Sequence, residues 1–164
     1  MEMLIAMRAF VERVVRYSAT VGMIFIIPLM LITAGDVLGR GVVSKPIAGT
    51  FELSEYMLAI IILLGTAYTQ QVKGHVAVDF LTTHFGTKTQ LVCQTITLLL
   101  SLFIVTILVW QGFKLGIEET GVTDQLRIPK APFKILTGIG GILLWLQILF
   151  DMIDAIVKLK RRES

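Results

Sequence analysis

Charged residues are scarce in this sequence: aspartate, glutamate, lysine and arginine together make up 16% of its 164 residues. An ordinary soluble domain carries about 25%. Apolar residues make up 55% of the chain, and the mean hydropathy is +0.80. The few charges cluster between long neutral runs, a pattern that is typical of a polytopic membrane protein rather than of an ordinary soluble domain.

Cysteine and histidine are also nearly absent, and this limits the chemistry that the chain can carry out. With a single cysteine, Cys93, a disulfide within one chain and thiol chemistry by paired cysteines are excluded. The two histidines, His75 and His84, lie between the second and third apolar runs, whereas haem ligands must face one another within spans. Asp79 is the one carboxylate near them, and these three side chains are too few to form a metal site. We therefore expect neither a cofactor nor a bound metal.

The sequence lacks the patterns of an enzyme site and of a nucleic-acid-binding surface. No arrangement of a nucleophile with a neighbouring base is visible, and no glycine-rich phosphate loop follows a strand. We therefore do not expect the chain to be an enzyme. The net charge of +3 raises the question of nucleic acid as a partner. The basic residues flank the apolar runs instead and form no stripe with interleaved aromatics, so nucleic acid is not expected.

Four membrane-length apolar runs dominate the sequence and predict spans over residues 14–38, 50–71, 89–113 and 132–156. Before them, Leu4, Phe10 and Val11 lie opposite Arg8 at helical spacing, which predicts a helix over residues 2–13 in the membrane interface. The predicted fold class is an all-α membrane protein with four transmembrane helices and an N-terminal amphipathic interfacial helix, forming one membrane domain over residues 1–164.

A cleaved signal peptide is the alternative interpretation of the first run. The uncharged stretch at residues 17–35 has 19 residues, longer than a usual signal sequence, and no small-x-small cleavage site is evident, so a retained span is favoured. Pro28 lies in the middle of this span. It should remove one backbone hydrogen bond and produce a kink or a packing defect.

The positions of lysine and arginine predict the orientation. The N-terminal segment, the loop between spans two and three, and the C-terminal tail carry three, two and four of them, nine in total; the opposite side carries six. Positively charged loops stay in the cytoplasm, so we expect both termini there. In the tail, Asp154 and Lys158 are expected to pair at i,i+4 spacing.

The acidic residues lie at the ends of spans and not in their middle. Asp36 and Arg40 form an i,i+4 pair at the end of span one, and Glu52 and Glu55 precede Tyr56 at the start of span two. Carboxylates at the mouth of an apolar run are costly to expose to lipid. They indicate either an interface with a partner subunit or lipid headgroups, or rim charges that face water.

Several short motifs occur in a characteristic order along nearly the whole chain. They are Pro-Ile-x-Gly, Glu-Leu-x-Glu-Tyr, Leu-Gly-x-Ala-Tyr, Gly-His-Val-x-Val-Asp and Leu-x-Ile-Pro, at residues 46–49, 52–56, 64–68, 74–79 and 126–129. In this order and spacing the sequence resembles the small membrane subunit, the DctQ-like subunit, of tripartite ATP-independent periplasmic (TRAP) transporters.

The resemblance implies a multi-pass subunit of a bacterial inner membrane. Its partners would be a large elevator-type, DctM-like membrane subunit, a periplasmic DctP-like solute-binding protein, and membrane lipids. In that family the large subunit carries the sodium and substrate sites, and the small one enlarges its fixed scaffold; organic acids such as C4-dicarboxylates are common cargo. Asp36, Arg40, Glu52, Glu55 and Tyr56 are the residues that we expect at the interface with the partner or with a lipid.

Two other functions fit the composition. A self-contained four-helix transporter or channel would work as a homo-oligomer and transport solute without a partner. A membrane-anchor subunit of a redox complex would bind haem or quinone.

Overall fold

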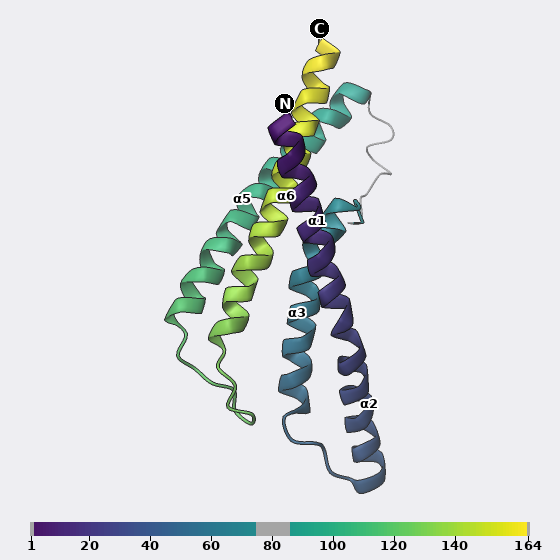
Figure 1. Ribbon diagram of the computed structural model, residues 1–164, viewed down its shortest axis with the longest axis vertical. Helices are drawn as coiled ribbons and strands as arrows, with labels where there is room; N and C mark the ends of the chain where they lie inside the picture. Colours follow the sequence, from purple (N-terminus) through teal and green to yellow (C-terminus); the bar gives the residue numbers. More distant parts are fainter. Residues whose placement is uncertain (1, 75–85, 164) are drawn as a thin grey trace.

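A computed structural model of the protein describes residues 2–74 and 86–163 (Figure 1). Its helices in these ranges are α1 (Glu2–Ile24), α2 (Ile26–Val43), α3 (Thr50–Gln71), α5 (Thr87–Glu118) and α6 (Ala131–Glu163). Four helical stretches are long and apolar enough to cross a membrane: Ala6–Val42, which combines α1 and α2, Thr50–Gln71, Thr89–Glu118 and Ala131–Lys158. The predicted all-α class with four transmembrane helices is therefore confirmed.

The segment that follows α3 carries several of the sequence-based expectations. Residues 75–85, which include His75, Asp79 and His84, lie outside the described residues. Among the residues that are described, no group of three or more histidine, cysteine, aspartate or glutamate side chains could hold a metal ion.

The N-terminal segment forms one continuous helix with the first half of span one, because α1 runs from Glu2 to Ile24 without a turn near residue 13. Val11 and Val15 show why: they lie four residues apart on one face and are both buried in the core. An apolar face that continues across the predicted boundary lets the helix pack without a break. A location of residues 2–13 in the membrane interface stays a prediction.

Span one is interrupted instead at Phe25, between α1 and α2. The Phe25 N–H donates to the Gly22 carbonyl at 3.1 Å, a tighter i→i−3 bond, before α2 begins. Pro28 has no N–H with which to bond the carbonyl of Ile24, so the helical ladder lacks a bond at this point. The irregularity expected at Pro28 is thus a break between α1 and α2, which lies just before the proline itself.

The core lies where α1, α3 and α6 meet, and it centres on Val11, Val15, Ala67 and Phe150. Gly140 on α6 allows the close approach of α3, because a Cβ atom there would lie 2.7 Å from the Leu63 carbonyl oxygen. α5 packs mainly against α6, and α2 packs mainly against α3. The outer faces of α2 and α5 stay exposed and carry many large apolar side chains.

The helices form two hairpins that lie together near the chain termini and separate toward the other end (Figure 1). We call the end with the N- and C-termini the termini end. The opposite end carries the α2–α3 turn, residues 44–49, and the loop between α5 and α6, residues 119–130, and we call it the loop end.

Candidate functional site

Glu52, in the first turn of α3, connects the two hairpins at the loop end. Its Oε1 atom accepts a hydrogen bond from the Gln125 N–H at 2.8 Å, and its Oε2 atom accepts one from the Leu126 N–H at 2.9 Å. In the other direction, the Gly49 N–H donates to the side-chain oxygen of Gln125. Hydrogen bonds to an ionised carboxylate are stronger than neutral ones, so loop 119–130 is firmly docked on the start of α3.

Gly49 makes this docking sterically possible. Its φ of 82° lies in the left-handed region that glycine adopts without steric cost. The Leu126 side chain lies directly over it: a Cβ atom added to Gly49 would be 2.5 Å from Leu126 Cδ2. Glycine thus serves both the turn before α3 and the contact with the loop.

Loop 119–130 has internal hydrogen bonds that keep it compact. The Thr123 N–H donates to the Ile128 carbonyl at 2.9 Å, and the Lys130 N–H donates to the Gly121 carbonyl at 3.0 Å. The Thr123 hydroxyl, which is buried, accepts a further bond from the Ile128 N–H at 3.0 Å. Glu52 therefore holds a folded hairpin-like loop and not an extended strand of chain.

The Asp36 carboxylate fixes the α2–α3 turn by accepting a backbone hydrogen bond, as the Glu52 carboxylate fixes loop 119–130. Its side chain is buried, its Oδ1 atom accepts a hydrogen bond from the Ile47 N–H at 3.0 Å, and its Oδ2 atom pairs with Arg40 at 2.5 Å. The expected i,i+4 pair is present, but the Asp36 carboxylate also fixes the turn. The Arg40 side chain stays 60% exposed.

A cleft of about 450 Å³ opens between α3 and α6 next to this docked loop. Tyr56 and Phe133 form one wall, with stacked rings whose centroids are 3.8 Å apart. Glu55 lines the cleft, is exposed, and forms no ion pair within the described ranges. The cleft thus offers a carboxylate beside an aromatic wall.

Lys134, which also lines the cleft, forms an ion pair with Glu119, the residue that follows α5. Glu119 additionally accepts a hydrogen bond from the Gly121 N–H at 3.0 Å. The Lys134 ammonium group and, secondly, the Gly121 N–H hold the pKa of Glu119 below its usual range. Glu119 is therefore a charged contact between the loop and α6.

All five sequence-predicted site residues lie at the loop end. Asp36, Arg40, Glu52 and Tyr56 make contacts within the chain, although the Arg40 side chain stays 60% exposed. Glu55 is exposed at the cleft and forms no ion pair with the described residues. A contact of these residues with a partner or lipid stays a prediction.

Sequence reasoning missed the residues that complete the site, namely Gln125, Phe133 and the pair of Glu119 and Lys134. Glu52 binds backbone N–H groups, which every residue except proline supplies, so the sequence contains no mark of them. The one feature of the sequence that pointed to this loop was Leu126, as part of the Leu-x-Ile-Pro motif.

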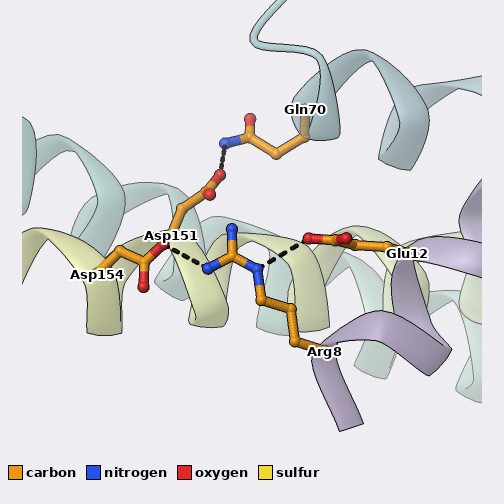
Figure 2. Close-up of polar contacts among 5 residues, drawn as sticks. All are labelled: Arg8, Glu12, Gln70, Asp151 and Asp154. Carbon is orange, nitrogen blue, oxygen red and sulfur yellow. Dashed lines mark hydrogen bonds and ion pairs between the residues drawn. The ribbon is translucent and has the colours of Figure 1, made fainter. Parts of the chain in front are cut away.

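A second polar cluster lies at the termini end, and Figure 2 shows its five side chains. Arg8 on α1 donates through Nε to Glu12 at 2.8 Å and through Nη1 to Asp154 of α6 at 2.5 Å. The Gln70 amide of α3 donates to Asp151 at 2.7 Å. Three helices that are far apart in the sequence are thus joined by side chains.

The predicted pairing of Asp154 with Lys158 is replaced by the pair with Arg8. The physical reason is the unbroken α1, which extends beside the end of α6 and brings the Arg8 guanidinium within hydrogen-bonding distance. A planar guanidinium with several N–H donors can bond two carboxylates at once, which an ammonium on the same helix does less well.

Comparison with known proteins agrees with this architecture. The family model for the DctQ component of tripartite ATP-independent periplasmic transporters matches residues 29–158. The match covers most of the chain and includes the α2–α3 turn, loop 119–130 and both aspartates of the termini end. A comparison with curated proteins found no match. The chain belongs to the DctQ component family of tripartite ATP-independent periplasmic transporters.

Proposed function

We propose that this chain is the small membrane subunit of a sodium-coupled transporter that carries organic acids, C4-dicarboxylates among them, across a bacterial inner membrane. In this proposal the chain supports a large, elevator-type DctM-like subunit. That subunit receives its solute from a periplasmic DctP-like binding protein and carries the solute and sodium sites. The family is one of transporter components, which favours a role without enzymatic activity.

The placement of charge is the observation that carries the scaffold role. The stretches 17–35, 56–72, 89–113 and 135–150 contain no aspartate, glutamate, lysine or arginine. Three of the carboxylates before and after them, Asp36, Glu52 and Asp154, are bound to a turn, a loop or a neighbouring helix. A solute or ion pathway ordinarily needs polar or ionisable groups within the membrane. Charges that lie at the span ends, several of them bound within the chain, support a scaffold.

The shape of the molecule supports the same role. An elevator moves one domain past another, and a wide, fixed partner resists being moved with it. The chain offers broad apolar faces to its surroundings: Met30 on α2 and Phe103 on α5 are 65% and 64% exposed. In a membrane such faces pack against lipid or against another subunit.

The first experiment compares the chain alone with the complete system in vesicles. The purified chain is reconstituted without partners, with the large subunit, and with the large subunit plus the binding protein, under an inward sodium gradient. Uptake of labelled C4-dicarboxylates and other organic acids is then measured.

We expect uptake in the complete system, its loss when sodium is replaced by potassium, and no uptake by the chain alone. Saturable, gradient-driven uptake by the chain alone would refute the scaffold role in favour of a self-contained transporter. A haem absorbance spectrum or bound quinone in the purified chain would instead indicate a redox anchor.

For the partner interface we propose a narrower role than the sequence suggested. Arg40 and Glu55 contact the large subunit or a lipid headgroup, while Asp36, Glu52 and Tyr56 keep the loop end in shape. Arg40→Glu and Glu55→Lys should each reduce co-purification with the large subunit. Lys158→Glu, an exposed residue at the termini end, is the matched control. Undiminished co-purification of both variants would remove these two residues from the interface.

We also propose that both termini lie in the cytoplasm, so that the loop end faces the periplasm. The excess of lysine and arginine on the terminal side supports this orientation. A C-terminal fusion to a protein that becomes fluorescent only in the cytoplasm should give signal, whereas a fusion to a periplasm-dependent phosphatase should be inactive. The reverse result would refute the orientation.

A further inference from the structure

A groove of about 620 Å³ runs between α5 and α6 in the half of the molecule near the loop end. It is separate from the cleft between α3 and α6. Val109, Trp110 and Phe113 of α5 line one side, Ile142 and Trp145 of α6 line the other, and its exposed walls are apolar. An occupant of this groove must therefore be hydrocarbon along most of its length.

A hydrogen bond between α5 and α6 joins the two walls of the groove. It also satisfies the indole N–H of Trp145, so that this polar group is not left without a partner in the groove. The Trp145 indole N–H donates to the Thr106 hydroxyl at 3.0 Å, and that hydroxyl in turn donates to the Leu102 carbonyl at 2.7 Å. Trp110, on the opposite wall, is 71% exposed. Tryptophan prefers the boundary between acyl chains and headgroups, which places this end of the groove near that boundary.

The length of the groove distinguishes between two kinds of occupant. From Thr106 to Lys114 the helix advances by eight residues, or about 12 Å at 1.5 Å per residue. One leaflet contributes about 15 Å of hydrocarbon, whereas a transmembrane helix of a partner would need about 30 Å. The groove therefore matches one acyl chain of one leaflet better than a spanning helix.

Lys114 lies at the end of the groove that is nearest the water boundary. It is the first charged residue after the neutral stretch 89–113, it is exposed, and it forms no ion pair within the part of the chain that the structure describes. The carboxylate nearest to Lys114 along α5, that of Glu118 one turn further, forms no ion pair with Lys114. An unpaired ammonium group at headgroup depth attracts a phosphate.

From these observations we propose that the α5–α6 groove binds one anionic phospholipid from the leaflet at the loop end. One acyl chain lies between Trp110 and Trp145, over Ile142, and the headgroup phosphate contacts the ammonium group of Lys114. The site does not depend on the cargo or the coupling ion of the transporter, so it can hold or fail independently of the proposed function.

The test uses the full chain, purified in detergent and stripped of lipid. It is titrated with phosphatidylglycerol or with phosphatidylcholine of the same acyl chains, and bound lipids are counted by native mass spectrometry. Ile142→Trp fills the groove, and Lys114→Gln removes the cation. Ile139→Trp, at an exposed α6 position that does not line the groove, and Lys158→Gln, at the termini end, are the matched controls.

We expect one saturable phosphatidylglycerol site in the original chain and in both controls, and weaker binding of phosphatidylcholine. Ile142→Trp should abolish the site. Lys114→Gln should weaken it about fivefold, the effect of about 1 kcal/mol per basic residue at a membrane surface. Circular dichroism before lipid addition verifies that each variant is folded.

Three results would overturn the proposal. The first is that Ile142→Trp binds phosphatidylglycerol as well as the original chain does. This would indicate that lipid surrounds the protein non-specifically. Another is equal affinity for the two lipids together with no effect of Lys114→Gln, which would exclude recognition of the anionic headgroup. The third is an empty groove in the original chain combined with loss of the large subunit from Ile142→Trp, which would assign the groove to a protein partner.

Discussion

The two ends of the molecule are held together by different kinds of contact. At the loop end, the carboxylates of Asp36 and Glu52 accept hydrogen bonds from backbone N–H groups of neighbouring turns and loops. At the termini end, Arg8 and Gln70 bond the side chains of Asp154 and Asp151 across helices (Figure 2). Apart from the ion pairs Asp36–Arg40 and Glu119–Lys134, the loop end depends on the path of the backbone, whereas the termini end depends on the identity of paired side chains.

This difference indicates which substitutions each end tolerates. A carboxylate that binds peptide groups does not depend on the side chains at those positions, but it needs the backbone to pass at the right distance and angle. An ion pair between helices requires complementary charge and is weakened by salt, particularly where water has access. The loop end should therefore respond to changes of backbone conformation, and the termini end to changes of charge.

The largest effect is expected from Gly49→Ala at the loop end. The substitution forces a residue with a Cβ atom into a left-handed conformation, at a cost of about 1–2 kcal/mol. It also pushes against Leu126, whose exposed side chain can partly move aside. We expect the free energy of unfolding in mixed micelles to fall by about 2 kcal/mol in total. Proteolytic cleavage in loop 119–130 should become faster.

Gly35→Ala is the matched control for this prediction. Gly35 lies within α2, and a Cβ atom there would meet no atom within 4 Å. In a helix interior alanine is favoured over glycine by about 0.5–1 kcal/mol, so this variant should be unchanged or slightly more stable. Equal destabilisation by the two substitutions would contradict the role given to Gly49.

The overall fold could be predicted because one physical requirement dominates it. Runs such as 89–113 contain no charge over a length that spans a bilayer, and helices are the structure that satisfies their backbone groups in lipid. The position of the break in span one was less predictable. Pro28 indicated a lost hydrogen bond, but the local geometry that absorbs it involves Phe25 and Gly22, which carry no signal for this in the sequence.

The candidate site could be predicted in its location but not in its contacts. Glu52 stands out because a carboxylate at the mouth of an apolar run needs a partner. That its partners belong to residues 125 and 126 depends on how the two hairpins pack, about 73 positions apart in the chain. The pairing of Arg8 with Asp154 likewise joins the two ends of the sequence, and local i,i+4 spacing favoured Lys158 instead.

A smaller effect is expected at the termini end, from the pair of Arg8 and Asp154. Their side chains are 36% and 45% exposed, so water screens the attraction. A double-mutant cycle with Arg8→Gln and Asp154→Asn should give a coupling energy of about 0.5–1 kcal/mol in low salt. The coupling should decrease in 1 M salt, where the Debye length is about 3 Å.

The salt dependence sharpens the comparison between the two ends. The same salt series applied to Gly49→Ala should leave its destabilisation nearly unchanged, because backbone strain and steric contact do not involve free charges. A coupling between Arg8 and Asp154 that salt did not alter would contradict the assignment of this contact as a screened ion pair. Lys158→Gln serves as the control, because Lys158 is exposed one turn further along α6 and forms no ion pair with the described residues.

The smallest effect concerns the charge contact at the loop end, between Glu119 and Lys134. The pKa of Glu119 is lowered in the folded protein, first by Lys134 and then by the Gly121 N–H. Above the pKa of the unfolded state, about 4.3, the contact contributes its full stabilisation; this is lost as the pH falls through the lower folded-state value. Unfolding measured in micelles from pH 6 to pH 3 should show a slope that Glu119→Gln reduces. Glu118→Gln, at the exposed residue next to it, should keep that slope, and equal slopes in all three proteins would mean that the contact does not stabilise the loop.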